Sequence, residues 1–105
     1  NQVLNCLIHD FNTLGCYDAP VVMRDGQGTL LKNNTIYRAG RDGIQMFHRE
    51  SEIAYNDVSF TNLIAHDCGP IYTLGGPFNS EIHHNWFHDV GGTGKTVQGM
   101  WHLPG

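Results

Sequence analysis

Positive charge is scarce in this sequence. Lysine and arginine together number 6 among 105 residues, against 10 aspartates and glutamates, which gives a formal net charge of -4 at pH 7. Proteins that hold the phosphate backbone of a nucleic acid need clustered cations to do so. We therefore expect no nucleic-acid partner for this chain.

Long apolar runs and leader segments are also missing. No stretch approaches the roughly 20 apolar residues that a membrane-spanning helix requires, and no signal peptide is recognisable at the amino terminus. We therefore expect no membrane partner. The chain begins at Asn1 and ends at Gly105, directly after a strand-like run, and we expect it to be a segment of a longer protein.

Cysteines are few and match no zinc-binding spacing. The three thiols, Cys6, Cys16 and Cys68, cannot all pair with one another, so we interpret them as small, mostly buried apolar side chains. Seven histidines are present, but no His-x-x-x-His on a helix, and adjacent histidines on a strand point to opposite faces. The sequence predicts no cofactor and no metal ion, and a metal site assembled from separate parts of the chain is the alternative.

The sequence does contain an internal repeat. Its template is an apolar residue, two variable residues, an asparagine, one variable residue and a second apolar residue. The full copies are Leu31–Ile36, Ile53–Val58 and Ile82–Phe87, and Gln2–Leu7 fits only from its asparagine onward. Their asparagines, Asn5, Asn34, Asn56 and Asn85, are 29, 22 and 29 residues apart. This spacing fits one coil of a β-solenoid with loops of variable length.

The asparagine of each copy is predicted to lie at a bend between two short strands. Asparagine tolerates the left-handed backbone that a sharp bend requires. Stacked from coil to coil, the four asparagines would pair their side chains in a ladder while the apolar positions of the template point inward. We expect these asparagines to belong to the scaffold and not to an active site.

A second block follows each repeat and supplies a third strand. Its copies are Ala19–Met23, Gly43–Phe47, Gly69–Thr73 and Gly99–His102. Strand alternation predicts Val21, Ile44, Ile71 and Met100 inside, and Val22, Gln45, Tyr72 and Trp101 outside on one face. Helix-period segments are absent, and 13 glycines punctuate the turns.

These patterns predict an all-β fold, a right-handed parallel β-helix of about four coils that forms a single domain over residues 1–105. An antiparallel sandwich is the alternative, but hairpins would not repeat one asparagine in one register. Neither end shows a polar cap, and exposed strand edges invite pairing with other strands. We therefore expect self-association through the uncapped ends of the solenoid.

Aspartates precede three of the third-strand blocks, at Asp18, Asp42 and Asp67. Equivalent positions in neighbouring coils lie about 5 Å apart. Asp42 and Asp67 are therefore predicted within the range of carboxylate separations that retaining or inverting glycosidases use. The alternative interpretation is that aspartates at strand entrances cap turns. We take Asp42 and Asp67 as the candidate catalytic carboxylates.

Two outward aromatic residues and a histidine are predicted beside these carboxylates. Tyr72 and Trp101, in adjacent coils, would form a stacking platform for sugar rings, although a loop or a partner could equally cover such a pair. His48 follows the third strand of its coil, and we place it on the same side as Tyr72, where it would contact substrate or carry a proton. These three are the candidate substrate-binding residues. An acidic cleft of this kind favours neutral sugars over polyanions.

The run from Gly40 to Val90 resembles a known family, and its carrying segments are Glu52–Val58, Asp67–Thr73 and Glu81–Val90. It is similar to the parallel β-helix proteins of bacterial polysaccharide degradation, particularly glycoside hydrolases related to α-fucosidases and xylanases that act on plant cell-wall glycans. The resemblance implies a catalytic role for Asp67 and cleft positions for Tyr72 and His48. It also implies an extracellular or periplasmic location.

Three functions follow from these expectations, with a polysaccharide or oligosaccharide as the partner. The first is a glycoside hydrolase that cleaves a cell-wall polysaccharide with paired carboxylates. The second is a non-catalytic glycan-binding or structural β-helix, which is favoured because Gly99–Pro104 stands where the family typically carries a pair of aspartates. The third is a polysaccharide lyase, in which Arg38, Arg41 and His48 would supply the cation and the base.

Overall fold

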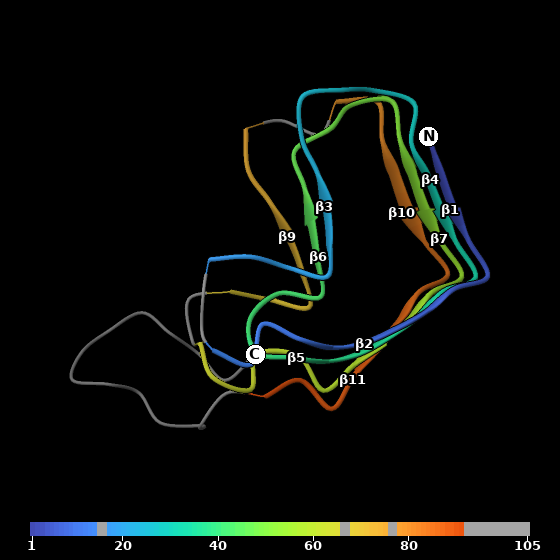
Figure 1. The fold of residues 1–105 in the computed structure, drawn as a ribbon. Helices are drawn as coiled ribbons and strands as arrows, with labels where there is room; N and C mark the ends of the chain where they lie inside the picture. The colour runs from blue at the N-terminus through green and yellow to red at the C-terminus, as the bar shows by residue number, and fades with distance from the viewer. Residues whose placement is uncertain (15–16, 66–67, 76–77, 92–105) are drawn as a thin grey trace.

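The computed structural model describes residues 1–14, 17–65, 68–75 and 78–91. In these segments the chain forms short β-strands, and each strand pairing is parallel. Figure 1 looks along the stack of coils and shows three sheets arranged around a common interior. The predicted parallel β-helix is therefore confirmed.

Each of the four coils contributes one strand to each of the first two sheets, and each of the first three coils contributes one to the third. The first sheet contains β1 (Gln2–Leu4), β4 (Leu30–Lys32), β7 (Glu52–Ala54) and β10 (Glu81–His83). The second contains β2 (Leu7–Phe11), β5 (Thr35–Ala39), β8 (Asp57–Ser59) and β11 (Trp86–His88). The third contains β3 (Val21–Met23), β6 (Ile44–Met46) and β9 (Ile71–Thr73). The third-strand block predicted for the fourth coil, Gly99–His102, lies outside the described residues.

The register lines up apolar side chains of successive coils inside the solenoid. In the third sheet Val21 lies opposite Ile44, and Ile44 lies opposite Ile71. Burying an aliphatic side chain of this size stabilises a fold by about 1.5–3 kcal/mol. The inward positions predicted for these three strands are confirmed. The buried cluster contains Val21, Met23, Leu31, Ile36, Ile44, Met46, Ile53 and Val58.

Asparagine side chains form the predicted ladder at the bend between the first and second sheets. The Nδ2 of Asn34 donates to the Oδ1 of Asn56 at 3.0 Å, and the Nδ2 of Asn56 donates to the Oδ1 of Asn85 at 2.9 Å. The Asn56 amide also accepts the backbone N–H of Asn34 and donates to the Leu31 carbonyl oxygen. All the hydrogen-bonding capacity of this buried amide is thereby used.

The first coil has a different register from the predicted one. Val3 lies opposite Leu31, so Cys6, and not Asn5, takes the ladder position. The backbone N–H of Cys6 donates to the Oδ1 of Asn34 at 2.9 Å. The alignment through Asn5 is therefore wrong by one residue. The polar Gln2 at the leading apolar position of this copy indicates the error, because a shift of one residue exchanges the two faces of a strand.

The left-handed backbone lies one residue before the ladder position. Asn33, Tyr55 and His84 have φ values of 57°, 56° and 54°, and Asn5 has 55°. The prediction that the ladder asparagines themselves take this conformation is wrong. The preceding residue makes the bend, which leaves the asparagine amide to the ladder. At one of these bends the left-handed residue is Tyr55, for which this conformation costs about 1–2 kcal/mol.

Candidate functional site

The outer face of the third sheet carries the middle side chain of each strand. Val22, Gln45 and Tyr72 lie opposite one another in the register, and strand alternation turns them away from the core. The outward column is confirmed for the strands that the structure describes. Gln45 is nevertheless only 2% exposed, because its amide is covered by the side chains of Arg24 and Asp42, to which it hydrogen-bonds.

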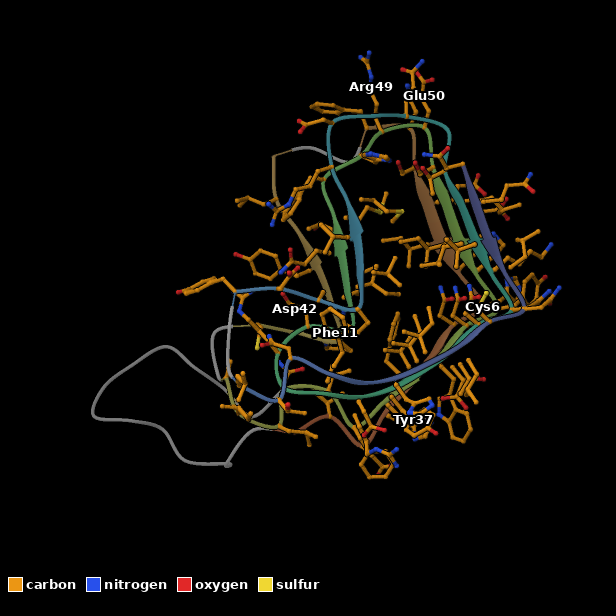
Figure 2. The ribbon with its side chains drawn as sticks, viewed as in Figure 1. Cys6, Phe11, Tyr37, Asp42, Arg49 and Glu50 are labelled. Carbon is orange, nitrogen blue, oxygen red and sulfur yellow. The ribbon has the colours of Figure 1, made fainter. Side chains whose placement is uncertain are left out.

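Asp42 lies fully buried beside Gln45, in the loop between β5 and β6 (Figure 2). Its Oδ2 accepts hydrogen bonds from Arg41 at 2.6 Å and from Gln45 at 2.7 Å. Its Oδ1 accepts the backbone N–H of Gly69 at 3.3 Å. A buried ion pair carries a large desolvation cost unless its polar atoms are well hydrogen-bonded. These donors meet that need and hold the carboxylate in place.

Gly43 lets the next coil approach Asp42. A Cβ at position 43 would lie 2.6 Å from a methyl carbon of Val58 and 2.8 Å from the Pro70 carbonyl oxygen. Without that atom, the backbone N–H groups of Gly43 and Ile44 both donate to this oxygen, at 3.1 and 3.0 Å. The close approach brings the neighbouring coil within hydrogen-bond reach of the carboxylate.

Aromatic rings flank the Arg41 guanidinium. Its central carbon lies 4.5 Å from the centre of the Tyr17 ring and 5.5 Å from that of Tyr72. Tyr17 is 79% exposed, whereas Arg41 is 6% exposed. Tyr72 also packs edge-on against Phe47, with ring centroids 6.4 Å apart. Tyr17, Tyr72 and Phe47 thus form an aromatic surface beside β6 and β9, which adjoins the buried ion pair of Arg41 and Asp42.

Two of the predicted site residues, Asp67 and Trp101, lie outside the described residues. Their catalytic and stacking roles stay predictions. The register does bear on the predicted pairing of carboxylates: Ile44 lies opposite Ile71, Asp42 stands two residues before the former and Asp67 four before the latter. The two aspartates are therefore offset by two residues in the sequence, and the predicted pairing of their carboxylates stays a prediction.

His48 does not lie with Tyr72. Its ring is 6% exposed, with Nδ1 3.1 Å from the Thr29 hydroxyl and Nε2 donating to the Arg24 carbonyl oxygen at 2.8 Å. It borders a cavity of about 210 Å³ together with core side chains of β3 and β4. The prediction of a shared face is wrong, because alternation continued from the inward Met46 turns His48 inward as well. Both ring nitrogens bond the scaffold.

The sequence contains three His-Asp pairs. His9–Asp10 and His88–Asp89 lie at the second sheet, away from this surface, and His66–Asp67 is outside the described residues. At His88, a hydrogen bond to Asp89 and a second one to Asp57 raise the pKa of the imidazole. Among the described residues, no three metal-ligating side chains gather into a metal site. No helix long and apolar enough to cross a membrane is found in the same part of the chain.

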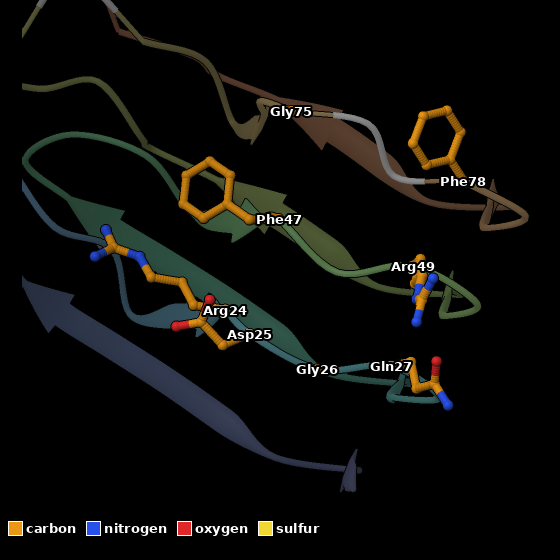
Figure 3. A pocket seen from close by; sticks show the side chains of 8 residues that line it. All are labelled: Arg24, Asp25, Gly26, Gln27, Phe47, Arg49, Gly75 and Phe78. Carbon is orange, nitrogen blue, oxygen red and sulfur yellow. The ribbon is translucent and has the colours of Figure 1, made fainter.

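A groove of about 790 Å³ lies beside the aromatic surface and was not predicted (Figure 3). Its walls are loop residues that follow the third strands of successive coils, and no motif in the sequence marks them. Arg24 and Arg49 are the only features of these loops that could have indicated a binding site from the sequence. The lining residues are Arg24, Asp25, Gly26, Gln27, Phe47, Arg49, Gly75 and Phe78.

The comparison with family models gives one match, described as a right handed beta helix region, over residues 1–99. The chain belongs to the right-handed β-helix family. This family is shared by carbohydrate-active enzymes and by other proteins. The match confirms the predicted fold and its handedness, and leaves the activity to be argued from the site. No curated protein and no solved structure matches the chain significantly.

Proposed function

We propose that this β-helix binds a glycan on the outer face of its third sheet. The observation that carries the proposal is the placement of Arg41 between the rings of Tyr17 and Tyr72, over the buried carboxylate of Asp42. Sugar rings stack on aromatic faces, and polar groups fixed beside those faces orient the hydroxyls of the ligand. The ion pair with Asp42 holds the Arg41 guanidinium in place between the two tyrosine rings.

A glycan-binding experiment with two tyrosine variants tests this proposal. Affinity electrophoresis against plant and algal polysaccharides would identify a ligand, and calorimetry would measure its Kd. Loss of one stacking ring corresponds to about 0.5–1.5 kcal/mol, so we expect Tyr72→Ala and Tyr17→Ala each to weaken binding by about tenfold or somewhat less. Tyr37→Ala is the matched control, because Tyr37 stacks on His9 on the second sheet. Absence of any bound glycan, or an equal effect of Tyr37→Ala, would overturn the proposal.

Hydrolysis of the bound glycan is the second candidate function, and one observation favours it. Asp42 accepts hydrogen bonds from three donors, the side chains of Arg41 and Gln45 and the backbone N–H of Gly69. Donors of this kind favour an ionised carboxylate, the state required of the nucleophile or base in a glycosidase. Asp67 is the candidate acid in this scheme. We place binding first because Asp42 is 0% exposed, whereas a catalytic carboxylate has to reach the substrate.

Substitution of Asp67 separates the two candidate functions. Hydrolysis predicts that Asp67→Asn abolishes the release of reducing ends while the Kd for the polysaccharide is retained. Non-catalytic binding predicts no turnover in the unchanged protein. A product that absorbs in the near ultraviolet would instead indicate a lyase, through the double bond that elimination creates. Unchanged turnover in Asp67→Asn would remove Asp67 from the mechanism.

A further inference from the structure

The groove beside the aromatic surface crosses three coils. Arg24 and the residues after it come from the first coil, Phe47 and Arg49 from the second, and Phe78 from the third. Figure 3 shows Arg24 with Phe47 at one end and Arg49 with Phe78 at the other. Its volume of about 790 Å³ is within the range of small-molecule and sugar sites.

The two arginines of this groove differ from the other two in the chain. Arg38 pairs with Asp10, and Arg41 pairs with Asp42. Within the part of the chain that the structure describes, neither Arg24 nor Arg49 forms an ion pair with a carboxylate. Both are exposed to solvent. Their guanidinium groups are therefore available for an anion that comes from outside the protein.

The scaffold holds the guanidinium group of Arg24 and the backbone of Arg49. Arg24 donates to the Oε1 of Gln45 at 3.1 Å, and its guanidinium carbon lies 5.3 Å from the centre of the Phe47 ring. Arg49 pairs through its backbone with Gln27 of the coil before, and its carbonyl oxygen accepts the N–H of Gly28 at 3.2 Å. A site whose groups are positioned in advance loses less conformational entropy when it binds a ligand.

His48 fixes the first-coil wall of the groove from beneath. Its Nε2 bonds the Arg24 carbonyl, and its Nδ1 bonds Thr29, so the ring spans the loop that carries Arg24. The loop can lie against the ring only because residue 26 is glycine: a Cβ there would be 2.8 Å from Nε2. His48 thus positions the loop that carries Arg24, and it is not itself a ligand-binding residue of the groove.

We propose that this groove binds a glycan that carries anionic substituents, uronate carboxylates or sulfate esters, and that Arg24 and Arg49 each bind one of them. This inference rests on the proposed glycan-binding function and names the ligand class. Guanidinium groups bind such anions through charge-assisted, often bidentate hydrogen bonds, and Phe47 and Phe78 offer ring faces to the sugar. Among the described lining residues Asp25 is the one carboxylate, against two arginines, so these residues have a net positive charge although the chain has a net charge of -4.

Matched charged and uncharged polymers test the inference. The probes are polygalacturonate and its carboxyl-reduced form, and a sulfated galactan and its desulfated form. We expect the charged member of at least one pair to bind about tenfold more tightly, as a charge-assisted hydrogen bond implies, and the pair that shows the difference identifies the substituent. The preference should shrink at high salt, because the groove is open to solvent.

An arginine variant assigns the preference to the groove. Arg49→Gln should weaken binding of the charged polymer about tenfold and leave the uncharged polymer unaffected, since Arg49 has an exposed side chain whose loss does not disturb the fold. Arg38→Gln is the control, because that arginine lies on the second sheet and is paired with Asp10. Equal binding of both polymers, or equal effects of Arg49→Gln and Arg38→Gln, would overturn the inference. Failure of every glycan to bind would instead overturn the proposed function.

Discussion

The Nδ2 of Asn34 donates to the Oδ1 of Asn56 across 3.0 Å, and the backbone N–H of Asn34 donates to the same oxygen. One amide oxygen of one coil therefore holds both the main chain and the side chain of the coil before. Because the arrangement repeats between Asn56 and Asn85, each coil fixes the position of the next one along the solenoid axis.

Asn56→Ala should be strongly destabilising. The substitution leaves the Asn34 amide groups and the Leu31 carbonyl without their partner in a buried setting. An unsatisfied buried polar group costs about 1–3 kcal/mol, and with several affected we expect a loss of about 2–4 kcal/mol in the free energy of unfolding, measured by urea denaturation. Thr35→Ala, at an exposed position of β5, should change it by no more than about 0.5 kcal/mol. Similar losses for the two variants would contradict the structural role of the ladder.

Cys6→Asn should extend the ladder by one rung. Cys6 occupies the ladder position of the first coil, and the Oδ1 of Asn34 is already bonded to its backbone N–H. The introduced amide would donate to that oxygen in the way that Asn34 donates to Asn56. One added hydrogen bond is worth about 0.5–1.5 kcal/mol of stability, to be read from the urea midpoint. Cys6→Ser, which is too short to reach, should give no gain, and a gain equal to that of asparagine would argue against a ladder bond.

Gly26→Ala should destabilise the protein through His48. The added Cβ would lie 2.8 Å from the Nε2 of a ring that is buried and bonded at both nitrogens, so the ring cannot yield freely. Overpacking of this kind costs about 1–3 kcal/mol. In a His48→Ala background the obstacle is gone, and the same substitution should cost less than about 0.5 kcal/mol. A double-mutant cycle measures this coupling, and additive effects would show that the ring does not support the loop.

The His88 imidazole should titrate above the ordinary histidine range. Its pKa is raised by the hydrogen bond to Asp89 and, next, by that to Asp57. Protonation is therefore favoured in the folded state, so the stabilising contribution is complete below the unfolded pKa of about 6.5 and is lost as the pH rises through the higher folded value. Proton NMR of the ring should show the pKa fall in Asp89→Asn and in Asp57→Asn. Asp25→Asn, in the groove, should leave it unchanged; a pKa insensitive to Asp89→Asn would contradict the assigned cause.

Much of the scaffold could be predicted because each coil repeats the same pattern of apolar and asparagine positions. The inward positions of Val21, Ile44 and Ile71 follow from alternation, and the asparagine spacing reveals the coil. The predicted register of the first coil is wrong by one residue because Asn5 fits the sequence template. Its neighbour Cys6 occupies the ladder position, although it has no side-chain amide. Only the pairing of the strands settles that choice.

The site was less predictable, because it depends on segments between strands. The inward turn of His48 could have been deduced by carrying the alternation of β6 two residues further. The groove could not, since Arg24 and Arg49 occupy different places in loops and line one groove only through the coil register. The net charge of the chain did not indicate a basic groove for the same reason. Four of the six cations in the sequence are arginines, and the two that form no ion pair with a described carboxylate line one groove.

The coils differ in length, and the difference is unevenly distributed. Asn34 and Asn56 are 22 residues apart, whereas Asn56 and Asn85 are 29 apart, yet the strands on both sides of the ladder keep their pairing. The additional residues of the longer coil fall in the loops before and after β9. The difference in length is thereby confined to the borders of the third sheet, where the proposed glycan site lies. If the proposed glycan site is correct, changes in the length of those loops can alter the ligand without disturbing the stacking of the coils.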